Sequence, residues 1–533
     1  MTASDHAQPN QLDQNSAASA STSRLWSISS RFSTTPPLAF AAVQWLVVGA
    51  MVLIMLGTPV LSGRNGMMNL TESWGALERV AMWQRSFSWF PGVELNGGAW
   101  RLPVPAIVWS VRLLLIALFA LHIFVFAAAW SGPQRSAWKW LIGPIGSGIL
   151  YLGFVPSNAD IFFYEMSGDV ANNGSNPYTH YLYEFTTNPL LPYNHWVDMT
   201  TVYGPFWTDV NRLIMGITGP DPYIATIVYK VMLGVVAIGL AGLVYWLTKR
   251  LTNSVRLATA AMVFVAWQPN ILLESAGQAH NDIVVAFIST FGIALALIGG
   301  MSALRGAIVL VTLSATVKYV SLPLVGVLAL LRLTEFRLSK SVRKLLQSWI
   351  LDGIAILAVV VATFAPYWAG ASTFREMFLE PGRLFAHPIW LVPYLVMSQF
   401  APGGVVSFYV DTMRTVLQIA TFALLGVAVY SFVRSLWTPA PDVDIRSTES
   451  QPWWSGHLIK VWVSIFAILA LVPVNSHSWY WTWTVAPIAV LVAWNHRGAS
   501  SDTRNTPETR WLVPYMFLIA TMTLIYHTRV VQH

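Results

Sequence analysis

The segment PSNADIFFYEMSGDVANNGSNPYTHYLYEFTTNPLLPYNHWVDMTTVYGPFW, residues 156–207, separates two long apolar runs, one ending just before residue 156 and the other beginning at Tyr223. Carboxylates and aromatic side chains gathered between apolar runs of membrane length predict a site that faces water at the bilayer surface. The carboxylates between the two runs include Asp160, Glu165, Asp169, Glu184, Asp198 and Asp209, and the strong cation there is Arg212.

The composition indicates the class of protein. Of the 533 residues, 55% are hydrophobic and only 10% are charged, with a mean hydropathy of +0.54. Soluble domains carry about 25% charged residues, so the deficit predicts a multi-pass protein of the lipid bilayer. The net charge of +7 indicates membrane orientation rather than a nucleic-acid partner, because the basic residues cluster in short loops. The absence of cysteine excludes disulfides, thiolate metal sites and cysteine nucleophiles.

The apolar runs predict an all-α fold, a membrane helical bundle of about 11–13 spans, because about 20 apolar residues cross the ~30 Å hydrocarbon core. The spans are expected near residues 38–61, 104–130, 138–155, 222–247, 255–273, 282–299, 349–368, 411–434, 458–474, 479–494 and 511–527.

Two parts of the chain are expected. Residues 1–37 are polar, without a periodic apolar face or the apolar core of a signal peptide, and predict a disordered cytoplasmic tail. Residues 38–533 form one transmembrane domain. Counting spans from a cytoplasmic start places the basic loop 332–344 inside, as the positive-inside rule requires. The same count places the acidic and partly helical loop 156–221 outside, which predicts an extracytoplasmic active site.

The apolar stretch 303–331 is too long for one crossing and too short for two, since a straight helix there is about 40 Å long. Lys318 lies near its middle and Pro323 follows. We therefore expect a re-entrant or broken helix pair with Lys318 near its outer tip. Irregular backbone at that depth requires cover by protein or water, which indicates a cavity.

Asp160 follows the third predicted span, and Tyr164 lies four residues later, on the same face of a helix. A single acid at this place is commonly a helix cap. The alternative is a general base whose pKa is raised by the nearby low dielectric. The shaped loop that follows, with turn residues at defined places, favours the second interpretation.

Three further polar corners are expected on the outer face. His280, Asn281 and Asp282 open the span at 282–299, where they either cap the helix or form an anion site at its N-terminus. An ammonium at the depth of Lys318 costs about 2.5–3.5 kcal/mol, so contact with an anionic substrate is favoured over snorkelling to the surface. His477 and Tyr480 either belong to an aromatic belt or contact a sugar.

The order of these motifs resembles the GT-C integral-membrane glycosyltransferases. Within that superfamily it is most similar to bacterial polyprenyl-phosphate-mannose-dependent α-1,6-mannopyranosyltransferases, over about residues 138–495. The residues that carry the resemblance are Asp160, Tyr164, Gly168, Asn176-Pro177-Tyr178, Tyr203-Gly204-Pro205, Gly277, His280-Asn281-Asp282 and Lys318.

The resemblance implies transfer of a hexose, mannose in the first instance, from a polyprenyl-phosphate sugar to a glycolipid or glycan acceptor, with inversion to an α-linkage. It implies Asp160 as the catalytic base, with Asp169 as a second catalytic carboxylate. The implied substrate-binding residues are Tyr164, Tyr178, Tyr203, His280, Asn281, Asp282, Lys318, His477 and Tyr480.

Other functions remain open at this stage. An embedded lysine and a helix-end anion site also suit a transporter or flippase of a glycolipid or small anion. A transferase of the same fold could carry arabinose or glucose instead of mannose. The acidic cluster could hold a metal, but the usual ligand spacings are missing, so no metal is assigned. No nucleotide-sugar fold is expected, because no Gly-rich phosphate loop follows a strand, and no cofactor is expected.

Overall fold

The computed structural model of the protein describes residues 35–56, 104–132, 136–154, 156, 160–377, 388–437, 452–473, 475–497 and, apart from 517 and 522, 515–524. All regular elements in these ranges are helices, accompanied by a single isolated bridge between Ala369 and Ala371. The predicted all-α class is confirmed. The tail predicted for residues 1–37 lies outside the described residues except for its last three.

Seven helical stretches among the described residues are long and apolar enough to cross a membrane, and the chain is a multi-pass membrane protein. The longest helices are α2 (Pro37–Leu56), α4 (Val104–Ser131), α8 (Pro222–Thr252), α11 (Asp282–Ala315), α14 (Val342–Phe364) and α17 (Gly403–Trp437). Shorter apolar helices complete the bundle: α5 (Ile142–Tyr151), α9 (Val255–Ala266), α12 (Leu322–Leu330), α18 (Ser455–Leu471) and α19 (Thr482–Asn495).

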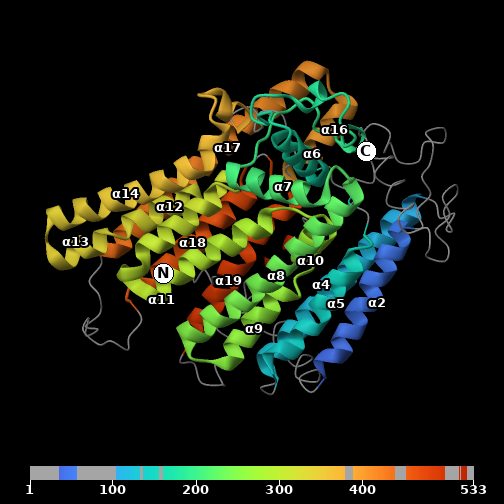
Figure 1. The fold of residues 1–533 in the computed structure, drawn as a ribbon. Helices are drawn as coiled ribbons and strands as arrows, with labels where there is room; N and C mark the ends of the chain where they lie inside the picture. Colours follow the sequence, from blue (N-terminus) through green and yellow to red (C-terminus); the bar gives the residue numbers. More distant parts are fainter. Residues whose placement is uncertain are drawn as a thin grey trace, which may run out of the picture.

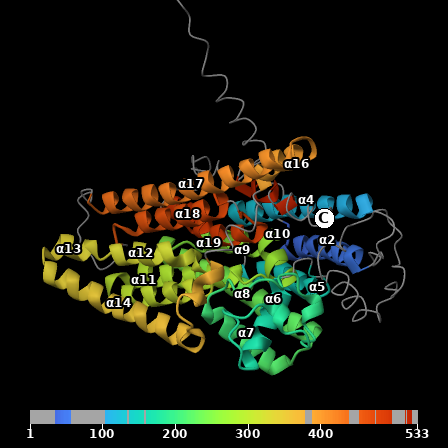
Figure 2. The ribbon, with the colours of Figure 1, turned by 90° about the horizontal axis from the view of Figure 1, so that it is seen from above.

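The helices pack side by side, with α8, α9 and α19 near the centre (Figure 1). Seen from above, α17 and α18 run together along one flank, and α14 lies on the other (Figure 2). Large apolar side chains such as Leu357 on α14 and Phe422 on α17 are more than half exposed, at 60% and 67%. In a bilayer these outer faces meet lipid, which replaces the missing protein partners.

The helix α11 is a hairpin rather than one straight span. Gly300 inside it has φ 59° and ψ −148°, outside the helical region. The chain reverses at Gly300, as a contact between the two arms shows: the Ser314 hydroxyl donates to the Val285 carbonyl at 3.2 Å. A Cβ on Gly292 would meet the side chain of Val311 at 2.7 Å, so the two arms are in close contact.

A second reversal at Lys318 forms the broken pair that the sequence predicted near 303–331. Lys318 is extended, with φ −151° and ψ 129°, between the end of α11 and the start of α12. Ser314 and Ser321 are hydrogen bonded at 2.9 Å on either side of it. At the other end of the pair, the Arg332 guanidinium lies 3.5 Å from the Met301 carbonyl oxygen. The prediction is confirmed, and Lys318 lies at the tip.

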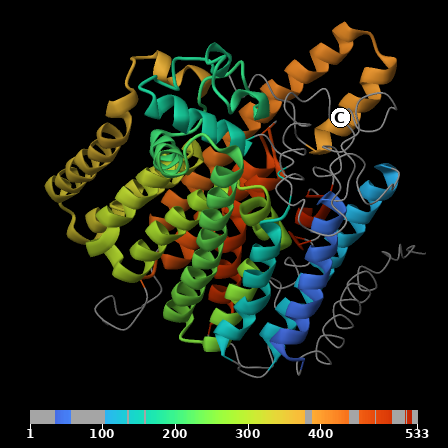
Figure 3. The ribbon, with the colours of Figure 1, turned by 45° about the vertical axis from the view of Figure 1, so that its right-hand side comes forward.

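The segment 156–221 is partly helical, as predicted, and contains α6 (Asp160–Asn172) and α7 (Pro205–Thr218) with two short 3-10 turns between them. Both helices lie across one end of the bundle (Figures 1 and 3). They pack closely because Gly168 of α6 has no side chain: a Cβ there would lie 2.6 Å from the carbonyl carbon of Asn211 in α7.

Gly204 fastens this segment to the tip of the broken pair. Its backbone N–H donates to the Val317 carbonyl at 3.0 Å, and the Phe206 N–H donates to the Thr316 carbonyl at 3.1 Å. A Cβ on Gly204 would lie 2.1 Å from the Thr316 oxygen. The Tyr203-Gly204-Pro205 motif therefore joins the segment 156–221 to the turn at Lys318.

We expect Gly204→Ala to lower the free energy of unfolding by about 2–3 kcal/mol, because the new methyl meets backbone that cannot move aside cheaply. The melting temperature of the purified protein in detergent measures the effect. Gly148→Ala, in α5, is the matched control, since a Cβ there meets nothing within 4 Å. Equal melting temperatures for the two variants would contradict the proposed docking.

Candidate active site

Side chains from distant parts of the chain meet where α6, the start of α11 and the tip at Lys318 come together. The residues in this cluster are Asp160, Tyr203, Glu274, His280, Asn281, Asp282, Lys318, Tyr480 and Trp483. Most are buried, but the side chains of Asp160 and Lys318 keep 11% and 17% of their surface exposed. The cluster is therefore reachable from one end of the bundle.

Asp160, the first residue of α6, is held by two donors. The Tyr203 hydroxyl donates to Oδ2 at 3.0 Å, and the Trp196 indole N–H donates to Oδ1 at 3.2 Å. Burial is the largest influence on its pKa and raises it, and Glu274 raises it further. Lys318 and the two hydrogen bonds act in the opposite direction without cancelling the burial. The result is a carboxyl group that binds a proton more tightly than an acid in water.

His280 lies between two carboxylates. Its Nδ1 is 3.6 Å from Asp160 Oδ2, and its Nε2 is 3.5 Å from Glu274 Oε2. The ring stacks on Trp479 with centroids 3.9 Å apart, and His477 stacks on the same indole at 4.4 Å. His477 thus reaches the cluster through Trp479.

Lys318 pairs with Asp282, its Nζ lying 2.9 Å from Oδ1. The ammonium also faces aromatic rings, with Tyr480 at 4.5 Å and Trp483 at 5.4 Å from Nζ to the ring centroid. Ring faces attract a cation when it is taken out of water. One of the three N–H bonds is directed at Asp282, which leaves others for a ligand.

Asn281 lies next to this pair, immediately before the first residue of α11, and its side chain is fully buried. Among the residues that the structure describes, neither atom of its amide has a hydrogen-bond partner. Buried polar groups are normally paired, so a ligand atom at this helix end would supply what is missing. The first turn of a helix also favours negative charge.

Tyr164 and Tyr178 both contact Tyr203. Tyr164 meets the Tyr203 ring edge-on, with centroids 4.9 Å apart. The Tyr178 hydroxyl donates to the Tyr203 carbonyl at 2.9 Å and lies 3.0 Å from Thr208 Oγ1. Both tyrosines therefore lie beside the cluster, where they contact Tyr203.

Asp169 is not brought to the cluster, contrary to the expectation of a second catalytic carboxylate. It lies nine residues after Asp160 on α6, which is about 13 Å along the helix axis. Its Oδ2 accepts hydrogen bonds from Asn188 at 2.6 Å and Asn173 at 3.2 Å. These contacts stabilise the surface loop.

Sequence reasoning did not assign Glu274 or Trp196 to the cluster. Glu274 was given no role, although a carboxylate inside an apolar run is a signal in its own right. Trp196 lies in an irregular loop, where no pattern indicates that its indole reaches Asp160.

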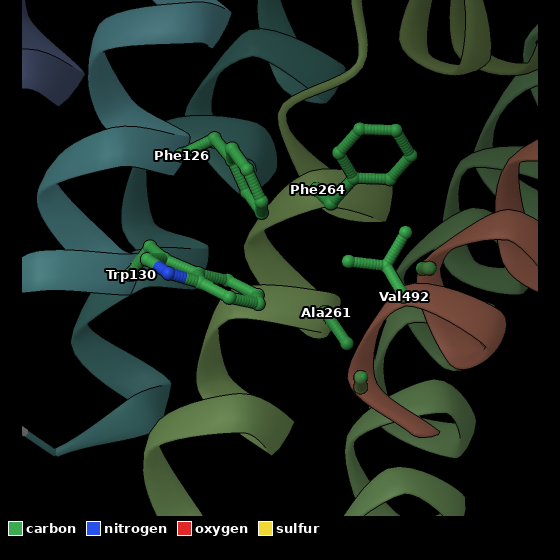
Figure 4. Close-up of a pocket in the computed structure, with 7 residues that line it drawn as sticks. Phe126, Trp130, Ala261, Phe264 and Val492 are labelled. Atoms are coloured by element: carbon green, nitrogen blue, oxygen red, sulfur yellow. The ribbon is translucent and has the colours of Figure 1, made fainter. Parts of the chain in front are cut away.

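Within the described ranges, no three His, Asp or Glu side chains are arranged to hold a metal ion. A small pocket between α4, α9 and α19 is lined by Phe126, Trp130, Phe264 and Val492 among other apolar side chains (Figure 4). Its lining has no titratable group, so it offers no chemistry.

Comparisons with known proteins agree with the motifs. Residues 150–334 match the family model described as "Alpha-(1->6)-mannopyranosyltransferase, N-terminal domain". The chain is 24% identical over 386 residues to alpha-(1->6)-mannopyranosyltransferase A of Corynebacterium glutamicum, a match that covers 63% of this chain and 75% of that protein.

Among solved structures, the chain matches the oligosaccharyltransferase of Archaeoglobus fulgidus in its apo form and tethered to an acceptor peptide, at 13% and 14% identity. The TM-scores are 0.35 and 0.36, and the matches cover 79% and 80% of this chain but only 56% of each solved chain. The resemblance to alpha-(1->6)-mannopyranosyltransferases that the motifs predicted is confirmed, and the class that the comparisons support is a membrane glycosyltransferase.

Proposed function

We propose that this protein transfers a mannosyl residue from a polyprenyl phosphate to a hydroxyl of a glycolipid or glycan, on the extracytoplasmic side of the membrane and with inversion. The observation that carries the proposal is the meeting of Asp160, His280 and Lys318 at one end of a helical bundle. Transfer from a lipid-linked sugar phosphate needs a base for the acceptor hydroxyl and a cation for the phosphate. Both must lie at the membrane surface, where the lipid tail can stay in the bilayer.

Asp160 acts as the base. Its carboxylate takes the proton of the acceptor hydroxyl while the hydroxyl oxygen forms a bond to the anomeric carbon. The bond from that carbon to the phosphate oxygen breaks, and the polyprenyl phosphate leaves with the electron pair. Attack on the face opposite a β-linked phosphate gives the α-linkage. A raised pKa suits the role, since a base near the operating pH is the most effective.

The leaving phosphate gains negative charge as the bond breaks, and fixed positive groups lower the energy of that state. Lys318, the N-terminus of α11 and the unpaired amide of Asn281 are the groups suited to it. Their position at the turn of a broken helix pair supports a headgroup site beside the lipid tail.

The basic residues at the opposite end of the bundle support the extracytoplasmic assignment. Lys249 and Arg250 end α8, about 40 Å along the axis from its start beside α7. Arg332 lies beside Met301, at the end of the broken pair away from Lys318. Basic ends of this kind favour the cytoplasm.

Asp160→Asn should lower transfer by about 100- to 10,000-fold, the range for loss of a general base. The measurement is incorporation of radiolabelled mannose from polyprenyl-phosphate mannose into glycolipid by membranes, with polyprenyl-phosphate glucose in parallel. Asp169→Asn on the same helix is the control, because Asp169 lies outside the cluster, and it should retain activity. Retained transfer in the Asp160 variant would remove it from the role of base.

Tyr203→Phe should move the acid limb of the pH–kcat profile upward by about one pH unit. The Tyr203 hydrogen bond lowers the pKa of Asp160, so its loss raises that pKa, and the active carboxylate then forms only at higher pH. Tyr178→Phe, which removes a bond to the Tyr203 backbone instead, should leave the limb where it is. A downward shift in the Tyr203 variant would be incompatible with a carboxylate base.

Lys318→Met should weaken donor binding at least 10-fold, since a charge-assisted hydrogen bond contributes about 1.5–3 kcal/mol. The single change also strands Asp282 as a buried, unpaired carboxylate. The double variant Asp282→Asn/Lys318→Met removes that problem, so it should regain thermal stability but not donor affinity. Recovery of both would show that Lys318 is needed only to balance Asp282.

A further inference from the structure

The backbone between Glu274 and His280 has an unusual course that brings their side chains together. Residues Leu273–Gly277 form a π-helical turn, a rare conformation that is frequent at functional sites. Ala279 has φ 60°, a left-handed conformation disfavoured for any residue with a Cβ. The His280 N–H then donates to the Glu274 carbonyl at 2.7 Å. A strained turn that persists in this way indicates a function for the contact it makes.

The side chains of this turn are fixed on several sides. The Ser478 hydroxyl donates to Glu274 Oε1 at 2.6 Å, while the other oxygen of Glu274 faces His280. Trp479 covers one face of the imidazole. Glu274 and His280 are 2% and 1% exposed, so water does not screen the charges between them.

The number of protons follows from this arrangement. A neutral imidazole has one N–H and one acceptor nitrogen, whereas an imidazolium donates from both. His280 has a carboxylate oxygen about as far from each nitrogen, at 3.6 Å and 3.5 Å. With a neutral ring, one carboxylate would face a nitrogen lone pair. Two carboxylates that face the two nitrogens of one imidazole therefore suit an imidazolium, which carries one proton more than the neutral ring.

We propose that Glu274 is a positioning residue that keeps this shared proton on His280, so that Asp160 remains an empty carboxylate ready to accept the acceptor's proton. The inference rests on the proposed function. With the proton on His280, the imidazolium has an anion on either side. With the proton on Asp160, the carboxylate of Glu274 would be buried beside a neutral ring, which is unfavourable.

The step is balanced in protons. During transfer, the acceptor proton joins Asp160, and the trio of Asp160, His280 and Glu274 then holds two. One returns to water through the exposed edge of Asp160 after the product leaves. The other titratable and charged groups that face the trio from its neighbouring elements are Tyr151, Tyr164, Tyr203, Asp282 paired with Lys318, and His477 behind Trp479.

The test is the pH dependence of kcat, and of KM for polyprenyl-phosphate mannose, in the full-length Glu274→Gln variant. Without the second carboxylate, the shared proton moves between Asp160 and His280, and a buried neutral pair is favoured. We therefore expect the acid limb of kcat to rise by about one pH unit, with activity recovered at higher pH and donor KM within about threefold of the wild type.

The direction of the shift decides the result. If Glu274 only repelled Asp160, its removal would lower the pKa of that carboxyl and move the limb downward. A downward shift, or a loss that does not depend on pH, would overturn the inference. Glu274→Asp keeps the negative charge but places it farther from His280, so it should move the acid limb upward by less than Glu274→Gln does. This variant replaces Glu274→Gln in the test if the Gln variant does not fold.

Glu165→Gln is the matched control. Glu165 is equally buried, on α6, but bonds to Thr226 of α8, so its change should leave the acid limb in place. If the wild-type protein transfers no mannose from the lipid-linked donor, the proposed function fails. If it does transfer mannose and only the expected upward shift is missing, the role of Glu274 alone fails.

Discussion

The ion pair between Lys318 and Asp282 is the contact on which the cluster depends. Each charge is costly to bury alone, and each is compensated by the other at 2.9 Å. The pair joins the tip of a broken helix pair to the first residue of α11, which are 36 residues apart in the chain. The pair therefore holds two charges together where the turn at Lys318 meets the start of α11.

Backbone contacts then bring the surface segment to this tip. Gly204 lies so close to Thr316 that a side chain is excluded, and two backbone hydrogen bonds fix the register. Tyr203 is adjacent to that contact and donates to Asp160. The carboxylate of α6 is thus positioned relative to Lys318 through a short series of contacts, which explains how one site is built from the segment 156–221 and the turn at Lys318.

Much of this arrangement could be predicted from the sequence, for identifiable reasons. Hydropathy predicts helical spans, and a lysine inside an apolar run of intermediate length predicts a break at Lys318. Counting membrane sides then places Asp160, His280 and Lys318 on one face. The contact of Glu274 with His280 could not be predicted, because it depends on a π-helical turn and on an alanine in a left-handed conformation. Asp169 lies near Asp160 in sequence, but nine residues of helix separate the two by about 13 Å along the axis, so Asp169 lies outside the cluster.

The charges of the cluster suggest why so many ionisable groups are gathered there. With His280 protonated as proposed, three carboxylates face one ammonium and one imidazolium, which leaves one net negative charge. In the proposed reaction, that negative charge disappears as Asp160 receives a proton, while the phosphate gains one negative charge on leaving. The total charge of the site is then the same before and after transfer. Separating charge in a medium of low dielectric is costly, so a reaction that shifts a charge between neighbouring groups without changing the sum suits a site at the edge of the bilayer.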